Sequence, residues 1–350
     1  MPRTLVTGAT GFLGSHLTRL LVERGDEVVA LVRPGSSLEV AAELGVATAR
    51  GDVRDRRAVR RAMRDADRVF HLAGTTNLRL SREETFALHV EGTRIMLEEA
   101  LRSGVERVVH TSSVAAIGPA RKGGVATEAH VWDAARYGIP FVDSKHEAEK
   151  VALALSERGL PVVIVNPATM LGPGDPGRSS TVLVERFLRR QIPAYVDGTL
   201  NIVGVQDVAR GHLLADERGV PGQRYILGNR NFTMDRLFAD LARLSGIDPP
   251  AVKLPARVAV ALAEGGQWVG GGTMPSPEEV RIISLNWACS SAKAKRELGW
   301  RTSPHEDCLE ETIAWYRERE GSELSPPGSR QPVALRVAGT LVRRSPLGWI

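Results

Sequence analysis

Residues 3–14, RTLVTGATGFLG, decide the fold class of this chain. Residues 3–7 read as a buried strand, and residues 12–24 have the leucine spacing of an amphipathic helix. Between them the spacing is G-x-x-G-x-x-G, with the glycines at Gly8, Gly11 and Gly14. Glycine permits a tight turn and close approach of a phosphate, and the following helix offers free N–H groups at its start. We therefore predict a loop that binds the pyrophosphate of a nicotinamide dinucleotide.

Strand and helix patterns alternate through the first half of the chain. The expected strands after the first are residues 27–33, 46–50, 68–72, 107–111 and 161–165. The expected helices after the first are residues 56–64, 82–102 and 141–158. This alternation predicts parallel strands with helices on both faces. Right-handed crossovers then give an α/β fold, a doubly wound parallel sheet of the Rossmann type.

The pattern loosens after Pro167, where a segment rich in glycine and proline follows. We expect a cofactor-binding domain over residues 1–170 and a smaller C-terminal substrate lobe over 171–320, with some segments returning to the sheet. Residues 321–350 form a tail that begins with a mobile stretch rich in serine, proline and glycine. For residues 333–350 a packed helix, a partner contact, a surface anchor and a disordered end all stay open.

Composition excludes several classes of protein. The net charge is +5 over 350 residues, but basic and acidic residues are interspersed, which favours a solvated surface over nucleic-acid binding. Cys289 and Cys308 suit neither a disulfide framework nor a metal site, so we expect no metal and a reducing, cytoplasmic location. Met1 leads directly into a predicted strand, so we expect no signal peptide. No apolar run approaches the roughly 20 residues of a transmembrane helix.

The end of the second strand indicates which cofactor binds. An acidic side chain there would hold a ribose hydroxyl, whereas a basic one accommodates a 2′-phosphate. The strand ends at Arg33, and Ser36 follows in the next turn. Arg33 and Ser36 can both donate to a phosphate, so we predict NADP(H), with NAD(H) as the alternative. Asp52, after the third strand, is a candidate acceptor for the adenine amino group.

Several further motifs resemble those of the extended short-chain dehydrogenase/reductases, the superfamily of NAD-dependent epimerases and dehydratases. The resemblance covers roughly residues 3–318. In the first half it rests on GDV at 51–53, HLAG at 71–74, VEGT at 90–93, TSS at 111–113 and SK at 144–145. In the second half it rests on VVIVNP at 162–167, PAYVD at 193–197, DVA at 207–209, YILG at 225–228 and SAKAKRELGW at 291–300. These motifs look like the branch of hopanoid-associated sugar epimerases and dihydroflavonol reductases, near the 3β-hydroxysteroid dehydrogenases.

The resemblance implies further cofactor contacts and a mode of assembly. In such proteins the turn after the fourth strand faces the nicotinamide ribose, and the Asn-Pro after the sixth strand borders the nicotinamide. The implied cofactor site therefore consists of Gly8, Thr10, Gly11, Phe12, Leu13, Gly14, Arg33, Ser36, Asp52, Val53, Leu72, Ala73, Gly74, Lys145, Pro167 and Thr169. Family members often form dimers through two long helices, so a homodimer is expected here by analogy.

One position departs from the family's chemistry. The family uses a serine, a tyrosine and a lysine four residues after the tyrosine, so that two side chains share one helix face. Ser113 and Lys145 match the serine and the lysine, but the tyrosine position holds Phe141. The lysine of the family lowers the pKa of the phenol, which then exchanges a proton with the substrate oxygen. Phenylalanine has no proton to give, so Phe141 is chemically inert.

Four explanations for Phe141 stay open. Another group supplies the proton, with Tyr137 and Ser113 as candidates, together with His89, which replaces the family's asparagine. Alternatively the enzyme promotes a cyclisation, isomerisation or elimination without net redox change. The chain could also be a Tyr-to-Phe variant of an ordinary enzyme, or a cofactor-binding protein without catalysis. We expect an NADP(H)-dependent ketone reductase or alcohol dehydrogenase with an atypical site, acting on a small molecule of specialised metabolism.

Overall fold

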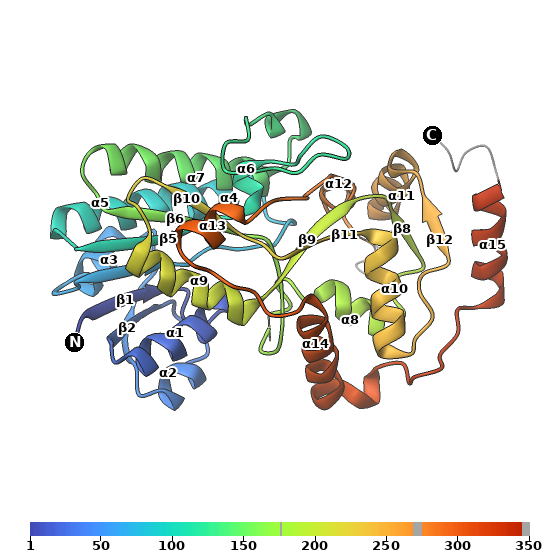
Figure 1. The fold of residues 1–350 in the computed structure, drawn as a ribbon, viewed down its shortest axis with the longest axis horizontal. Helices are drawn as coiled ribbons and strands as arrows, with labels where there is room; N and C mark the ends of the chain where they lie inside the picture. Colours follow the sequence, from blue (N-terminus) through green and yellow to red (C-terminus); the bar gives the residue numbers. More distant parts are fainter. Residues whose placement is uncertain (176, 269–274, 345–350) are drawn as a thin grey trace.

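The computed structural model describes residues 1–175, 177–268 and 275–344, and it is built around one parallel sheet of seven strands (Figure 1). The strand order is β10-β6-β5-β4-β1-β2-β3, and every neighbouring pair is parallel. The strands are β1 (Arg3–Thr7), β2 (Glu27–Val32), β3 (Ala47–Arg50), β4 (Arg68–His71), β5 (Arg107–Thr111), β6 (Val162–Pro167) and β10 (Arg224–Leu227). The predicted doubly wound α/β sheet is confirmed.

Helices cover both faces of this sheet. Successive side chains of its strands point to opposite faces, and each face packs into its own apolar core. Val6, Phe70 and Val163 belong to the core shared with one set of helices, whereas Leu5 and Val69 belong to the core on the opposite face. The first set comprises α1 (Phe12–Arg24) and α9 (Val205–Arg218). The second set comprises α3 (Arg56–Ala62), α5 (Gly92–Ser103) and α7 (Pro140–Glu157). A short helix, α2 (Glu39–Glu43), joins β2 to β3.

The prediction of one continuous helix over residues 82–102 is wrong, because the helix is interrupted in its middle. The structure has α4 (Arg82–Phe86), then a π-helical turn η1 (Ala87–Glu91), and only then α5. A π turn holds one more residue than an α turn and therefore rotates the side chains that follow it. His89 lies in this widened turn, buried against the start of α7. Hydrophobic periodicity alone does not reveal such an interruption.

A smaller lobe packs beyond the carboxyl ends of the strands. Its core gathers α8 (Val182–Leu188), α10 (Met234–Ser245) and α14 (His305–Glu320) around a three-stranded sheet. That sheet contains β7 (Thr169–Leu171), β9 (Thr199–Gly204) and β11 (Arg230–Thr233), and a two-stranded sheet contains β8 (Ala194–Val196) and β12 (Val252–Leu254). The remaining elements are α6 (Val114–Ile117), η2 (Ala134–Tyr137), α11 (Ala256–Trp268), α12 (Pro277–Ile283), α13 (Ala292–Glu297), η3 (Gly321–Glu323) and α15 (Val333–Arg344). Residues 205–227 return to the large sheet as α9 and β10.

The segment predicted to be mobile makes backbone hydrogen bonds to the smaller lobe. The Ser325 amide donates to the carbonyl oxygen of Leu188, and the Gly328 amide donates to that of Gly246. After it, α15 lies against β12, where a Cβ on Gly339 would come within 2.1 Å of the Ala251 carbonyl oxygen. Of the alternatives for the tail, a packed helix describes residues 333–344, and residues 345–350 lie outside the described part. Among the described helices, none is long and apolar enough to cross a bilayer.

A buried carboxylate joins α9 to the first strands of the sheet. The Asp216 side chain is fully buried, and its Oδ2 accepts from the Arg24 guanidinium at 2.8 Å and from that of Arg68. Arg24 also pairs with the buried Asp26 at 2.7 Å. A buried ion pair that loses one partner leaves an uncompensated charge. This cluster therefore fixes the packing of α1 against α9.

We predict that Asp216→Ala lowers the free energy of unfolding by about 3 kcal/mol, because two partly buried arginines lose their shared partner. Urea denaturation followed by circular dichroism measures this change. The matched control is Glu217→Ala on the same helix, since Glu217 is half-exposed and lies 3.9 Å from Arg24. That variant should change stability by no more than about 0.5 kcal/mol. Equal losses in the two variants would contradict the role of Asp216.

Candidate active site

The carboxyl ends of the parallel strands bring the predicted site residues to one edge of the sheet. The glycine loop follows β1, Arg33 and Ser36 follow β2, and Asp52 and Val53 follow β3. The turn with Leu72, Ala73 and Gly74 follows β4, Ser113 follows β5, and Pro167 ends β6, with Thr169 starting β7. Phe141 and Lys145 lie on the first two turns of α7. In open α/β sheets this edge is where ligands bind.

The glycine loop has the shape that a dinucleotide pyrophosphate needs. Gly8 has φ = +74°, and its carbonyl oxygen accepts from the Gly11 amide at 3.0 Å. A Cβ on Gly14 would lie 1.9 Å from that same oxygen, so only glycine fits there. The 13-residue helix α1 begins directly after Gly11 and has no acidic residue in its first turn. The start of α1 is therefore suited to an anion.

Three charged side chains stand at the ends of β2 and β3. Arg33 is exposed, and Asp52 is half-buried beside it. Arg54 pairs with Asp52 through two hydrogen bonds of 2.9 Å, from Nε to Oδ1 and from Nη2 to Oδ2. Hydrogen bonding to Arg54, with the charge of Arg33, holds the pKa of Asp52 below its usual value. Asp52 is thus an ionised acceptor between two cations.

Lys145 stands half-buried at the centre of the site. Its Nζ lies 3.5 Å from the Thr111 carbonyl oxygen at the end of β5. A Cβ on Gly74 would lie 3.4 Å from both Nζ and the His89 Nε2 atom, so the ammonium and the imidazole flank this turn. Burial lowers the pKa of Lys145 to about 8, and the charge of Glu149 opposes that shift. Lys145 can therefore exchange a proton near neutral pH.

Ser113 faces the site from the start of the short helix α6. Its Oγ accepts from the Ala115 amide at 3.1 Å and caps this helix. The Ser113 carbonyl oxygen accepts from the Asn166 side chain at 3.0 Å. The hydroxyl hydrogen of Ser113 is not used by either bond. It is therefore free to be donated to a substrate oxygen.

His89 is held by hydrogen bonds on both ring nitrogens. The Thr75 amide donates to Nε2 at 3.0 Å, which makes Nδ1 the protonated nitrogen. The Nδ1 atom lies 2.8 Å from the Ser144 hydroxyl oxygen, which in turn donates to the Phe141 carbonyl oxygen at 3.0 Å. Burial and the charge of Lys145 lower the pKa of His89 to about 2. In this arrangement the imidazole is neutral and both nitrogens are engaged, which favours a positioning role over proton transfer.

Phe141 is part of an apolar wall. Its ring meets the His89 ring edge to face, with centroids 5.8 Å apart. It packs with Tyr137 and Trp287 in a cluster that also includes Ile139 and residues of α6 and α12. The Tyr137 hydroxyl accepts from the Arg136 guanidinium at 2.9 Å. Tyr137 therefore lies beside Phe141 without replacing its missing hydroxyl.

A buried carboxylate that the sequence reasoning missed supports both Lys145 and Ser113. Glu149 is one turn after Lys145 on α7 and is 1% exposed. It accepts from the Asn166 amide at 2.6 Å and from the Arg224 guanidinium at 2.8 Å. Since Asn166 also holds the Ser113 carbonyl, one network joins α7, the end of β6 and β10 to the site. The spacing of four from Lys145 is the sequence signal that could have revealed it.

Buried histidines lie beneath the site. His71 and His110 are neighbours on β4 and β5, with stacked rings whose centroids are 5.4 Å apart. Thr7 and Thr93 bind the two ring nitrogens of His71, and neither nitrogen of His110 has a hydrogen-bond partner within the described residues. Burial lowers the pKa of His71 to about 3 and that of His110 well below its usual value. His71 and His110 are therefore neutral and add no positive charge beside Lys145.

Other candidates have structural roles or lie elsewhere. Asp143 is buried and pairs with Arg82 at 2.8 Å. Asp175 accepts from the amides of Ser179, Ser180 and Thr181 and orders that loop. The cysteines are buried and unpaired, which raises the pKa of each thiol to about 12. Across the described ranges, no group of His, Cys, Asp or Glu has the arrangement of a metal site.

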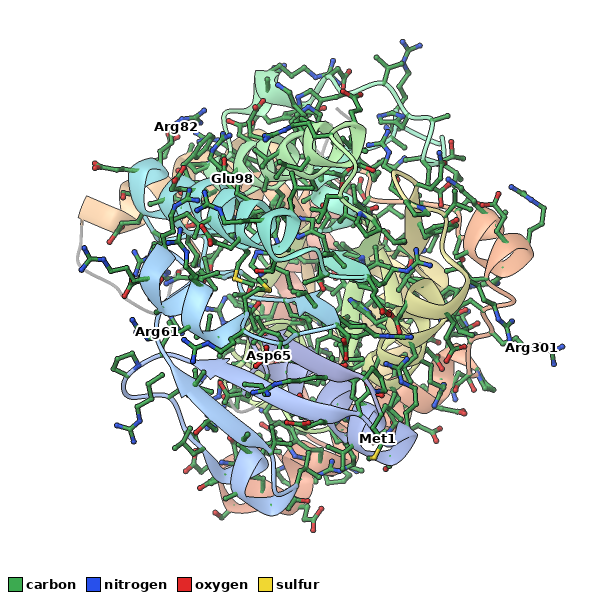
Figure 2. All side chains as sticks on the ribbon, turned by 90° about the vertical axis from the view of Figure 1, so that its left-hand side faces the viewer. Met1, Arg61, Asp65, Arg82, Glu98 and Arg301 are labelled. Atoms are coloured by element: carbon green, nitrogen blue, oxygen red, sulfur yellow. The ribbon has the colours of Figure 1, made fainter. Side chains whose placement is uncertain are left out.

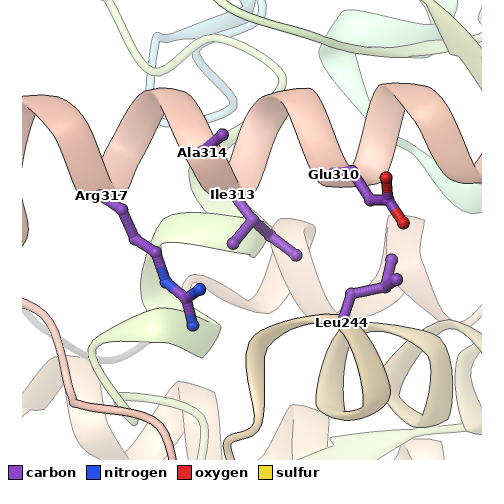
Figure 3. Close-up of a pocket in the computed structure, with 5 residues that line it drawn as sticks. All are labelled: Leu244, Glu310, Ile313, Ala314 and Arg317. Carbon is purple, nitrogen blue, oxygen red and sulfur yellow. The ribbon is translucent and has the colours of Figure 1, made fainter.

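A surface groove lies between α10 and α14, away from the glycine loop (Figure 3). It has a volume of about 400 Å³, with Ile313 and Ala314 between the charged Glu310 and Arg317. The Arg317 guanidinium donates to the Ser245 carbonyl oxygen, which ties α14 to α10. None of the residues lining it belongs to the predicted site.

The fold and the residues at the sheet edge define a Rossmann-type enzyme, and comparisons with known proteins agree. The model of the NAD dependent epimerase/dehydratase family matches residues 4–228. Sterol demethylase protein B of Methylococcus capsulatus is 33% identical, over 90% of this chain and 98% of that protein. A putative dihydroflavonol 4-reductase of Synechocystis is 36% identical, over 89% of this chain and 94% of that protein.

Solved structures agree with these relatives. The crystal structure of gox2253 has a TM-score of 0.81 at 37% identity and covers 91% of this chain and 99% of its own. The structure of DesIV, a dTDP-glucose 4,6-dehydratase from Streptomyces venezuelae with NAD bound, has a TM-score of 0.75 at 25% identity, covering 91% and 98%. This chain belongs to the NAD dependent epimerase/dehydratase family. The resemblance to extended short-chain dehydrogenase/reductases and the expectation of an enzyme are thereby confirmed.

We predict that Glu149→Gln lowers the pKa of Lys145 by about one unit from its value of about 8, because an opposite charge near the ammonium is lost. The pH dependence of acetylation of Lys145 by acetic anhydride, resolved by mass spectrometry, measures this pKa without any substrate. The control is Glu147→Gln on the same helix, since Glu147 pairs with Lys150 at 3.0 Å and is half-exposed. An unchanged midpoint in Glu149→Gln, or the same shift in both variants, would refute the role of Glu149.

Proposed function

We propose that this enzyme is an NADP(H)-dependent reductase or dehydrogenase that interconverts a ketone and an alcohol on a small apolar molecule. The observation that carries the proposal is the meeting of Ser113 and Lys145 with the glycine loop at one sheet edge, beside Phe141. The N–H groups at the start of α1 can bind a dinucleotide, and Ser113 and Lys145 can donate hydrogen bonds to a substrate oxygen. The phenol that relatives would use is replaced by an apolar ring.

The chemistry divides between the cofactor and the protein. When bound, the nicotinamide exchanges a hydride with the carbinol carbon. In the direction of reduction, the Ser113 hydroxyl donates a hydrogen bond to the substrate oxygen, and the positive charge of Lys145 stabilises the negative charge that develops there. The oxygen must then gain one proton. We assign that proton to Lys145, because its pKa is about 8 whereas both nitrogens of His89 are engaged.

The apolar wall supports the assignment of the substrate class. The half-buried rings of Phe141 and Tyr137 pack in one apolar cluster with Val114 and Ala115, which directly follow Ser113. A flat, apolar substrate gains contact with such rings, whereas a charged one would lose hydration there. Two relatives carry names that refer to a sterol and to a dihydroflavonol. We therefore propose polycyclic ketones and alcohols as the class to screen.

Phe141→Tyr tests the redox assignment. With ketones of that class and NADPH, the wild-type rate should fall as the pH rises through about 8, since deprotonated Lys145 cannot donate. Phe141→Tyr should raise kcat by on the order of a hundredfold, because a phenol restores a general acid. Tyr137→Phe is the control and should leave both the rate and its pH profile unchanged. Loss of activity in the control would move the proton transfer to Tyr137.

Phe141 also supports a second function, a cyclisation, isomerisation or elimination in which the substrate keeps its oxidation state. The same screen distinguishes the two by mass spectrometry of the product. A ketone that gains two hydrogens while NADPH is consumed supports the reductase. A product of unchanged oxidation state, formed without net NADPH consumption, would overturn it.

Arg33 carries the preference for NADP(H) in this proposal. The side chain is exposed at the end of β2, and Arg54 adds a second cation near Asp52. Arg33→Ala should weaken NADPH binding about tenfold and leave NADH binding unchanged, because a charge-assisted bond to the 2′-phosphate is lost. Fluorescence titration measures both affinities, with the exposed Arg57→Ala on α3 as the control. Tighter binding of NADH than NADPH by the unmodified protein would contradict the preference.

The remaining expectations belong to the same proposal. We assign cofactor binding to residues 1–170 and substrate binding mainly to residues 171–320, with residues 321–350 as a tail. A homodimer follows by analogy with the family. The two buried thiols, Cys289 and Cys308, support a reducing cytoplasmic location.

A further inference from the structure

Exposed aliphatic side chains gather at one end of the molecule, on α11 and α15. Val258 and Leu262 of α11 are 44% and 53% exposed, and Val333 and Val337 of α15 are 73% and 53% exposed. In each helix the two side chains are four residues apart and therefore share one face. Figure 1 places both helices at the end of the molecule opposite the N-terminus. Exposed aliphatic residues concentrated in this way indicate an interaction surface.

The helix α15 divides into an inner and an outer face. Gly339 is buried against Ala251, and Leu335, one turn earlier, is half-buried. The residues on the outer face are exposed, namely Val333, Arg336, Val337 and Thr340. The inner contact fixes the helix on β12. The valines and the arginine therefore project outward together from a fixed platform.

The charge of the C-terminal segment that contains α15 has one sign. After Glu323 the sequence contains four arginines and no aspartate, glutamate or lysine. On α11 the exposed Arg257 lies next to Val258, and Glu264 pairs with Arg281 of α12 at 2.9 Å. Aliphatic residues interspersed with arginine on one helix face suit an interface that is anionic at its surface and apolar beneath. A protein partner would need a groove that places acidic groups and an apolar surface at the spacing of the arginine and the valines.

We propose that α15, with the exposed side chains of α11 at the same end of the molecule, docks this enzyme on the surface of an anionic phospholipid bilayer. The arginines meet the lipid phosphates, and the valines enter the boundary between headgroups and acyl chains. The helix lies on the membrane and remains attached to β12. This surface is separate from the candidate active site, and the proposal does not depend on the reaction.

Sedimentation with lipid vesicles tests the proposal on the full-length protein without turnover. The probes are vesicles of phosphatidylcholine containing phosphatidylglycerol, compared with vesicles of phosphatidylcholine alone. We expect binding to the anionic vesicles that weakens with added salt. Arg336→Glu should reduce the partition coefficient at least about fivefold, the factor expected for one arginine at an anionic surface. The double variant Val333→Ser/Val337→Ser should reduce it as well, since less apolar surface enters the bilayer.

Matched controls distinguish binding through this surface from nonspecific binding of the protein to vesicles. Val131→Ser/Val220→Ser removes two valines that are 81% and 53% exposed elsewhere. Arg301→Glu reverses an exposed charge on a side chain that projects from another part of the surface (Figure 2). Both controls should bind vesicles like the unmodified protein. Equal binding to neutral vesicles, no binding, or an equal loss in the controls would overturn the proposal. So would a dimer, measured by light scattering, that Val333→Ser/Val337→Ser dissociates, since the occupant would then be a second copy.

Discussion

The approach of Gly14 to the carbonyl oxygen of Gly8 is the constraint on which the rest of the structure depends. A Cβ on Gly14 would lie 1.9 Å from that oxygen, so α1 can follow β1 this closely only with glycine at the contact. The close turn aims the start of α1 at the carboxyl edge of the sheet. All the other strands end at the same edge because they run parallel to β1. One steric requirement thus places the start of α1 at the sheet edge where Ser113 and Lys145 also lie.

The sequence predicted the parts of the molecule that depend on local pattern. Buried strands such as residues 3–7 and 107–111 show an apolar run between breakers, and the structure has them with the same bounds. The interruption at Ala87–Glu91 escaped, because a π turn changes the hydrogen-bond ladder without changing composition. The backbone hydrogen bonds from Ser325 to Leu188 and from Gly328 to Gly246 were not predicted either, because composition does not encode them.

The residue types of the candidate site, which stay predictions, come from the sequence, whereas the electrostatics around them do not. Lys145 and Phe141 could be found from a spacing of four on one helix. Glu149, Asn166 and Arg224 come from three separate elements, and only the tertiary structure shows that they form one network. The same holds for His89, whose neutral state follows from burial and the charge of Lys145. The Thr75 amide, which donates to Nε2, sets its tautomer. Burial thus keeps His89 neutral and favours a positioning role for it, and Lys145 is the group whose pKa is about 8.

The central claim is that the glycine loop holds a nicotinamide dinucleotide whose reactive end lies between Lys145 and the ring of Phe141. A crystal structure of the protein grown with NADP⁺ tests this claim most directly. The account predicts density for the pyrophosphate at the start of α1, the 2′-phosphate at Arg33, and the nicotinamide ribose within hydrogen-bond distance of Lys145. A nucleotide bound elsewhere would contradict the account. A nicotinamide turned away from Phe141 would also contradict it. So would crystals grown with saturating NADP⁺ in which the glycine loop holds no dinucleotide.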